Sequence, residues 1–386
     1  MDTEAGLAAK RDELGRQMAG YRSLPEYILD GLGAVIQRVF NPRKFRERAS
    51  FLPPDASAQE QEYFPSYPWT GAAIAVFTFL IGWLLSALSG HRLSADEFKL
   101  MAWAAFTGAL ALVINKINIR AFLNTFRRSC VDRLLRIADI NELEKWLESN
   151  FKSWLPWFLI LGLGGGPFLG WFLYSNWLVN HAATAVFRLG PFVTVALACI
   201  QAVWVAIYLI PFYVAFPSLL NRYHFDLYTL DPSSSEVVGQ LSRLLTFILY
   251  ATMAYIVQLT IGLSYVEVLT AKTPVSGFIF SAFVWAPTIS LYASGQFHLS
   301  NIISRAKWKT LNEVQTKIEE LNEAGKIPDK DTLERLDKLM NYHDRIRDTP
   351  NSALNFRAGL NFLNSLLLPV AAFVVANFKD VIAFFN

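Results

Sequence analysis

The chain has 386 residues, of which 53% are hydrophobic and 17% are charged, and its formal net charge is only +3. This composition argues against a water-soluble globular protein and favours a protein that lives in lipid. With two cysteines, the chain also excludes a Cys-rich metal site.

Seven hydrophobic runs, each without Asp, Glu, Lys or Arg in its interior, dominate the sequence. They are residues 69–88, 100–115, 155–178, 192–219, 244–265, 277–292 and 359–378. An α-helix rises about 1.5 Å per residue, so roughly 20 apolar residues span the hydrocarbon core of a bilayer. The runs therefore predict an all-α polytopic membrane protein with about seven transmembrane helices and cytoplasmic helical extensions.

Charge is distributed unevenly between the connections. Lys and Arg crowd into residues 116–152 and 305–357, whereas the connections around 91–92, 180–188 and 267–272 carry few. Because basic loops stay in the cytoplasm, we expect a cytoplasmic N-terminus and, after seven crossings, an external C-terminus. If the last run is re-entrant, the C-terminus is internal. No signal or transit peptide is visible, which favours the bacterial inner membrane.

Residues 1–68 form the predicted N-terminal cytoplasmic region. Helices are expected near residues 3–21 and from residue 25 onwards, followed by a Pro-rich linker at 51–68. The second helix has two interpretations. It is either part of a small helical subdomain or an interfacial helix that lies on the inner leaflet.

Residues 69–300 hold six of the crossings and a basic cytoplasmic helical loop at 117–153, with a helix break expected at 139–142. The loop contains the candidate anion ligands Arg120, Arg127, Arg128, Arg133 and Arg136. They are either a positive-inside signal that contacts acidic lipid, or a site for a nucleotide or a short nucleic acid. For the second reading, Phe122, Phe126 and Trp146 are candidates for base stacking.

A glycine cluster at 162–170 lies inside the third run. It predicts either close helix packing, because small residues let backbones approach, or an unwound pore element.

Residues 301–350 predict a cytoplasmic helical hairpin. Apolar side chains recur with the 3-4-3 spacing of a coiled-coil seam. They are Leu311, Val314, Ile318 and Leu321, followed by Leu333, Leu336 and Met340, with His343 completing the pattern. Gly325 and Pro328 mark the turn between the two helices.

Residues 351–386 contain the last crossing and its polar stripe. Asn355, Asn361, Asn364 and Ser365 precede the apolar run, and the last three share one helical face. Such side chains must face protein or water inside a membrane. They are therefore candidates for a pore lining or for interhelical hydrogen bonds.

Signatures of catalysis are missing from the sequence. The five histidines are scattered, and neither an HExxH, a P-loop nor a GxSxG motif is present. We therefore expect no enzyme, no catalytic residue, no metal site and no cofactor. Cys130 is either a redox sensor or an ordinary buried thiol.

The basic helices, the hairpin and the segment Thr-Pro-Asn-Ser-Ala-Leu-Asn at 349–355, which runs into the last crossing, support a resemblance. In size and layout, the whole chain resembles the membrane effectors of the Hailong anti-phage defence system. The resemblance implies an oligomeric, tetrameric pore that conducts ions. It also implies a partner nucleotidyltransferase whose product, a short single-stranded DNA or nucleotide, keeps the pore shut.

The first functional hypothesis is a gated oligomeric channel, an anti-phage effector that depolarises the inner membrane when it is released from an inhibitory ligand. The last crossing is the expected pore helix, and the basic cytoplasmic helices are the expected sensor. The alternatives are a membrane scaffold that recruits partners through the hairpin, and a facilitative transporter. The missing intramembrane charge disfavours coupled transport. An intramembrane enzyme ranks last.

Overall fold

The computed structural model describes residues 4–40, 67–152, 155–181, 187–210, 212, 216–268, 274–322 and 330–351. This part of the chain is helical and contains no strand, which confirms the predicted all-α class. The first α-helices are α1 (Glu4–Gly20), α2 (Leu24–Phe40), α5 (Tyr67–Leu88), α6 (Ala95–Ser129) and α7 (Ile137–Lys152). They are followed by α8 (Leu155–Asn180), α9 (Leu189–Ile210), α10 (Phe216–Leu220), α11 (Glu236–Tyr265), α12 (Pro274–Asn322) and α13 (Lys330–Arg347). Short 3-10 helices, η1 (Val131–Arg133) and η3 (Pro232–Ser234), precede α7 and α11.

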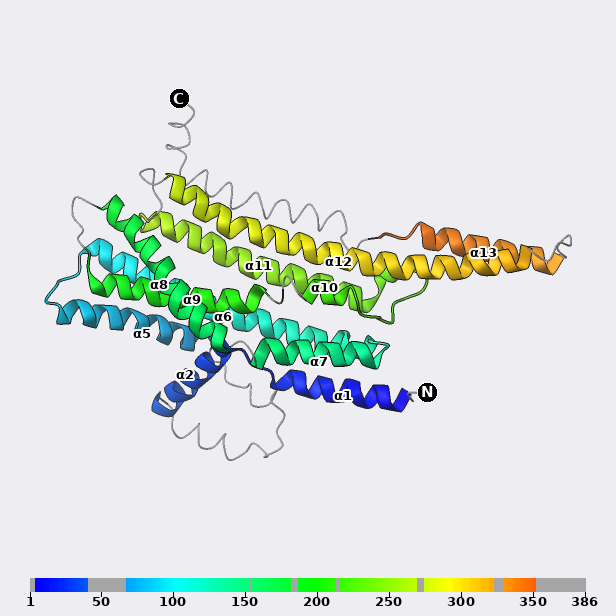
Figure 1. Cartoon of the computed structure of the whole chain (residues 1–386), viewed down its shortest axis with the longest axis horizontal. Coiled ribbons are helices and arrows are strands. Elements are labelled where there is room, and N and C mark those ends of the chain that lie inside the picture. Colours follow the sequence, from blue (N-terminus) through cyan, green and yellow to red (C-terminus); the bar gives the residue numbers. More distant parts are fainter. Residues whose placement is uncertain are drawn as a thin grey trace, which may run out of the picture.

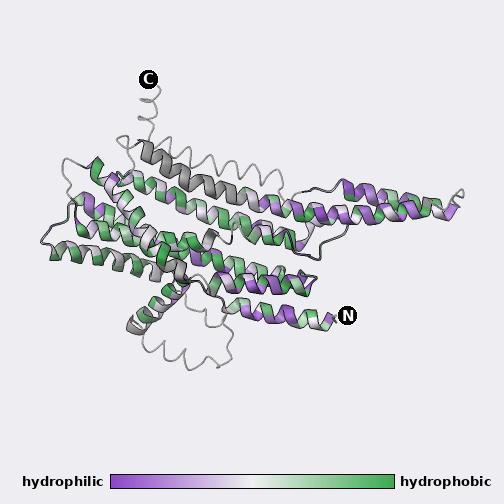
Figure 2. Ribbon diagram, in the orientation of Figure 1, coloured by the Kyte–Doolittle hydropathy of each residue, from purple (hydrophilic) through white to green (hydrophobic). Residues whose placement is uncertain are grey.

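The long helices run side by side along the long axis of the molecule (Figure 1). Helices α5, α8 and α11 finish at one end, which we call the loop end. Helices α1, α7 and α13 lie at the other end, which we call the helical end. Hydrophilic residues concentrate in α13, the far part of α12 and α1, whereas hydrophobic residues dominate towards the loop end (Figure 2). The predicted basic segments therefore gather at one end of the molecule.

Four helical segments in the described part are long and apolar enough to cross a membrane. They are Trp69–Leu88, Ala95–Arg133, Leu189–Tyr208 and Glu236–Tyr265. They correspond to the first, second, fourth and fifth hydrophobic runs. The third run lies in α8, and the sixth lies in the first part of α12. The seventh run, at 359–378, lies outside the described residues, so seven crossings remain a prediction.

The sixth run and the first helix of the predicted hairpin are one continuous helix. Helix α12 has 49 residues, which corresponds to about 73 Å at 1.5 Å per residue. The boundary that the sequence suggests at 300/301 therefore falls inside α12.

Helix α13 packs back along α12, as a hairpin requires. The Lys307 ammonium donates to the carbonyls of Arg347 and Thr349, at 2.7 Å in each case, which fixes the C-terminal end of α13 beside the middle of α12.

The contact residues of the hairpin correct the predicted seam. Leu311 and Val314 are buried with Ile318 on α12, as predicted. On α13, however, Leu339, Tyr342 and Ile346 make the contact, whereas Leu333 and Met340 are half exposed. The seam of α13 is thus displaced from the expected register, and a coiled coil in the strict sense remains a prediction.

The helix break in the basic loop is earlier than the sequence suggests. Helix α6 ends at Ser129 and α7 begins at Ile137, so the expected break at 139–142 is wrong. The intervening residues pair with a distant segment: the Leu135 N–H donates to the His224 carbonyl at 2.9 Å, and the Asp226 N–H donates to the Arg133 carbonyl at 2.8 Å. We call this pairing of 133–135 with 224–226 the bridge. Its hydrogen bonds satisfy backbone groups that would otherwise continue a helix.

The fourth hydrophobic run contributes two described helices. Helix α9 ends at Ile210, and the short α10 begins at Phe216. Pro211 follows α9 in the sequence and has no N–H to continue the helical hydrogen bonds. Residues 211 and 213–215 lie outside the described residues, so one crossing over 192–219 stays a prediction, and the described candidate span is Leu189–Tyr208.

The third run packs closely against the fourth. Gly162, Gly166 and Gly170 recur every four residues on α8, and a Cβ on any of them would collide with α9. The colliding residues on α9 are Trp204, Ile200 and Ala196, in reverse order, so the helices are antiparallel. We call this contact the glycine seam. It bears out the packing interpretation of the glycine cluster, because α8 remains helical from Leu155 to Asn180 rather than unwinding.

Candidate functional site

Helix α2 begins with a reciprocal cap that the residues Ser-Leu-Pro-Glu at 23–26 specify. The Ser23 hydroxyl accepts a hydrogen bond from the Glu26 N–H at 3.4 Å, and the Glu26 carboxylate accepts one from the Ser23 N–H at 2.7 Å. This is a capping box, which satisfies two backbone donors at a helix start. The Leu24 N–H donates to the Tyr208 hydroxyl of α9 at 2.8 Å, so the start of α2 is fixed to the bundle.

The body of α2 lies on the apolar bundle. Leu29 is buried in a cluster with Ile74 of α5, Leu112 of α6 and Val205 of α9. The opposite face of α2 is also apolar but exposed, with Tyr27 and Val35 more than half accessible. None of the described residues covers this face, and an exposed apolar face beside candidate membrane spans suits contact with lipid. The geometry thus favours the interfacial interpretation of this helix over a detached subdomain.

Two acidic residues of α2 pair with two basic residues of α6. The Arg120 Nε lies 2.5 Å from the Glu26 Oε1, and the Lys116 ammonium forms an ion pair with Asp30. Arg22 approaches Asp30 at 3.4 Å from the other side. Glu26 is fully buried and Lys116 is 3% exposed, so this is an internal charge cluster. We call the contact between Glu26 and Asp30 of α2 and residues 115–120 of α6 the polar junction.

Burial changes the pKa of the Glu26 carboxyl in the polar junction. Removal from water raises the pKa of the Glu26 carboxyl above its ordinary value, while the Arg120 guanidinium and the Ser23 N–H oppose the rise. Desolvation is the larger effect, since a carboxylate loses most of its hydration in this position. Burial therefore favours the protonated form of the Glu26 carboxyl.

Two amides of α6 lie in the same turns as the basic residues. Asn115 and Asn118 are 0% and 2% exposed, and no nitrogen or oxygen of either amide has a hydrogen-bond partner among the described residues. A buried amide without a partner is costly unless water, an ion or another chain satisfies it. Asn115 and Asn118 therefore mark a place where the bundle interior has unused hydrogen-bonding capacity.

The five predicted anion ligands are not equivalent in the structure. Arg120 is engaged by Glu26, and Arg133 lies 3.6 Å from Asp226 and 4.0 Å from Glu236. In the described part of the chain, no ion pair forms at Arg127, Arg128 or Arg136. Arg128 and Arg136 are exposed and Arg127 is half buried, with its side chain against Gly15 of α1. These three remain candidates for an anionic ligand.

The aromatic residues proposed for base stacking pack against other aromatic rings inside the protein. Phe122 and Phe126 are almost completely buried, with their rings 4.5 and 5.0 Å from the ring of Phe216. Trp146 packs on Phe212 with centroids 5.3 Å apart. The stacking role is therefore wrong, since these faces cover one another rather than solvent. Cys130 is buried in the same cluster, which places it as an internal thiol.

Polar side chains in the middle of the bundle pair between helices. Gln201 of α9 donates to Thr78 of α5 at 3.2 Å, and Gln258 of α11 donates to Thr107 of α6 at 3.1 Å. These contacts hold neighbouring helices together. The pore candidates Asn355, Asn361, Asn364 and Ser365 lie outside the described residues, so the pore lining stays a prediction.

Sequence reasoning missed the acidic half of the junction. Glu26 and Asp30 are four residues apart on α2, and Lys116 and Arg120 are four residues apart on α6, so each pair occupies one helical face. Two acidic residues and two basic residues with the same four-residue spacing were the signal that could have predicted this contact between α2 and α6.

The comparisons with known proteins place the chain in no family. A scan against protein-family models finds no match. Searches of curated proteins and of solved structures find no match either.

Proposed function

We propose that the chain forms a gated oligomeric channel in the bacterial inner membrane, with the helical end in the cytoplasm. The observation that carries the proposal is the polar junction, which places buried charges in the middle of the candidate membrane span Ala95–Arg133, together with two amides that have no partner among the described residues. Ionisable and amide groups at such depth are costly and mark ion pathways more often than simple structural contacts. The concentration of Lys and Arg at the helical end supports the orientation.

Gating is proposed to act through α2. This helix packs on α5, α6 and α9 and is held by the capping box, the Tyr208 contact and the two ion pairs. A ligand can shift the gate only if it binds the open and closed states with different affinity. Arg127 lies against α1, which is joined to α2 by three residues, so charge neutralisation there would act on the same segment.

The ligand and the biological role follow the resemblance described above. We propose an anionic cytoplasmic ligand, a short single-stranded DNA or nucleotide from a partner nucleotidyltransferase, that holds the channel shut through Arg127, Arg128 and Arg136. Release of the ligand would open the pore and depolarise the membrane, as an anti-phage effector does. A tetramer is the oligomer that this proposal implies.

Ion flux in liposomes tests the channel. Purified wild-type protein is compared with Asn115→Leu/Asn118→Leu and with Asn361→Leu/Asn364→Leu, because the two pairs separate the junction from the last crossing. The control is Asn312→Leu, the same change on an exposed position of α12. We expect flux in the wild type and the control, and a loss in at least one double variant. No flux from correctly inserted wild type, with and without short DNA, contradicts the proposal.

The scaffold remains the second candidate because of the hairpin surface. Trp308 of α12 and Met340 of α13 are 60% and 50% exposed, although the hairpin is otherwise charged. Leu311→Asp should abolish partner binding while membrane insertion survives, and intact ion flux in that variant would separate the two functions.

A further inference from the structure

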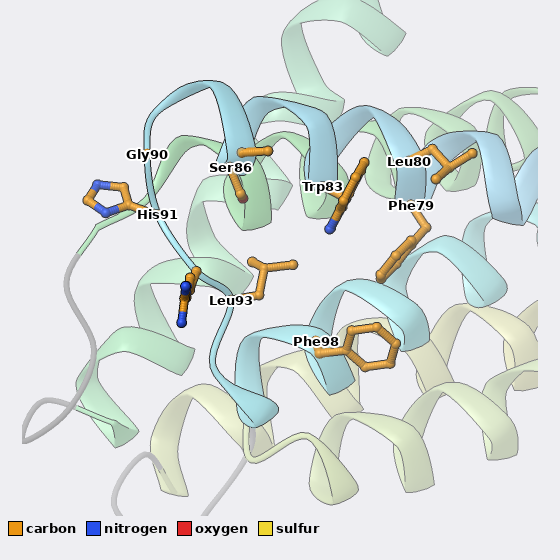
Figure 3. Close-up of a pocket in the computed structure, with 10 residues that line it drawn as sticks. Phe79, Leu80, Trp83, Ser86, Gly90, His91, Leu93 and Phe98 are labelled. Carbon is orange, nitrogen blue, oxygen red and sulfur yellow. The ribbon is translucent and has the colours of Figure 1, made fainter.

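A groove opens between α5 and α6 at the loop end, on the side of the molecule away from the polar junction. Its volume is about 640 Å³. The floor is apolar and comes from both helices: Phe79, Leu80 and Trp83 of α5 face Phe98 of α6 and Leu93 of the connection (Figure 3). The rings of Phe79 and Phe98 meet edge to face at 5.1 Å. The groove is thus a slot in the surface of two helices that face lipid.

A specific turn builds the mouth of this groove. Gly90 has φ +72°, and its N–H donates to the Ala87 carbonyl, while the His91 N–H donates to the Ser86 carbonyl. This pattern is a Schellman motif, in which glycine adopts the left-handed conformation that other residues resist. The turn fixes His91 and Arg92 at the mouth, and the Arg92 carbonyl accepts a hydrogen bond from the Arg188 guanidinium at 3.2 Å.

The mouth carries an uncompensated positive charge. Lys99 pairs with Asp96 at 3.1 Å, and Arg188 pairs with the buried Glu97 at 2.7 Å. No ion pair of Arg92 occurs in the described ranges, and this residue is exposed. The nearby acidic side chains Asp96 and Glu97 are therefore already in ion pairs with other residues. The Arg92 guanidinium is available to bind an anion from outside the chain.

The position of the groove along the membrane-spanning segment indicates which class of ligand it would bind. Its apolar floor occupies the last turns of the membrane-spanning segment Trp69–Leu88, and Arg92 lies four residues beyond that segment. In a bilayer, this order places the floor at the level of acyl chains and the guanidinium at the level of phosphate groups.

We propose that this groove binds one anionic glycerophospholipid of the leaflet at the loop end. An acyl chain lies in the slot between Phe79, Trp83 and Phe98, and the phosphate contacts Arg92. The inference rests on membrane insertion alone and does not depend on channel activity.

Native mass spectrometry of the full chain in detergent tests the site, with phosphatidylglycerol and phosphatidylethanolamine of the same acyl chains as probes. We expect the wild type to retain one phosphatidylglycerol per chain in preference to phosphatidylethanolamine. Arg92→Gln should weaken phosphatidylglycerol binding about five-fold, the effect typical of one basic residue near an anionic surface. Trp83→Ala should weaken both lipids, because it removes the wall of the acyl slot.

Matched controls make the result decisive. Arg335→Gln removes an exposed arginine of α13, and Trp308→Ala removes an exposed tryptophan of α12, and both should bind as the wild type does. The proposal is overturned if Arg92→Gln keeps the wild-type preference, if Arg335→Gln loses it equally, or if glycerol phosphate without acyl chains competes as well as the lipid. A thermal melt of each variant in the same detergent shows that the fold survives.

Discussion

The glycine seam and the polar junction are two helix contacts of opposite chemistry in the same bundle. In the seam, α8 and α9 approach through glycines, and a Cβ at Gly166 would lie only 2.4 Å from the Ile200 Cγ1. In the junction, α2 meets α6 through charges, and Glu26 is fully buried against Arg120. The first contact depends on shape and the second on charge compensation. Helices that lie in lipid gain from close packing, whereas buried ions must be paired to be tolerated at all.

The difference has a consequence for function. A seam of backbone contacts has one good arrangement, because every displaced glycine loses its close neighbours. A junction of ion pairs has a second state, since a competing charge can release it. The proposed gate accordingly lies at α2 rather than at the contact between α8 and α9.

The largest expected effect comes from breaking the junction on its acidic side. Glu26→Ala removes one half of the buried Glu26–Arg120 ion pair, and breaking a buried pair typically destabilises a protein by about 3 kcal/mol. The control is Glu13→Ala on α1, which removes an exposed ion pair to Arg16 and should cost below about 0.5 kcal/mol. Thermal unfolding in detergent measures both, and hydrogen exchange should increase in α2. Equal stability of the two variants would contradict the assignment of Glu26 as a structural ion-pair partner.

The seam should respond to added volume rather than to lost charge. Gly166→Ala introduces a Cβ into the α9 backbone, and overpacking of this kind costs about 2 kcal/mol. Gly164→Ala is the matched control, because nothing lies within 4 Å of its Cβ position. Both variants gain the same helix propensity, so the difference in the free energy of unfolding isolates the seam. If Gly166→Ala is as stable as Gly164→Ala, α8 and α9 are not in the contact described.

These two contacts differ in how far the sequence predicts them. The seam is local: three glycines at intervals of four residues on one helix indicate close packing before any partner is known. The junction joins Glu26 to a residue 94 positions away, so Arg120 looked like a free cation in a basic loop. The same limit explains the displaced seam of α13, since spacing predicts a helical face but not which of two neighbouring faces meets α12. It also explains the early break before α7, which depends on the distant segment at 224–226.

The pH dependence of the free energy of unfolding should show the direction in which folding shifts the pKa of Glu26. Because burial raises the pKa of the folded carboxyl above 4.5, the folded protein binds this proton more tightly than the unfolded chain. The stability contributed by Glu26 is therefore greatest below pH 4.5 and falls as pH rises through the folded pKa. We expect the free energy of unfolding of the wild type, relative to Glu26→Gln, to increase between pH 7 and pH 4.5. A decrease over this range would show that Arg120 outweighs desolvation.

The smallest effect is expected at the bridge between 133–135 and 224–226. Its ion pair between Arg133 and Asp226 spans 3.6 Å, but the side chains are 44% and 60% exposed. Exposed pairs of this kind contribute below about 1 kcal/mol, so Asp226→Asn should change the free energy of unfolding by less than about 0.5 kcal/mol. The two backbone hydrogen bonds of the bridge are left intact by this substitution. Denaturation in low and high salt provides the measurement, and a large salt-dependent loss in Asp226→Asn would mean that charge, rather than backbone pairing, holds this end of the molecule together.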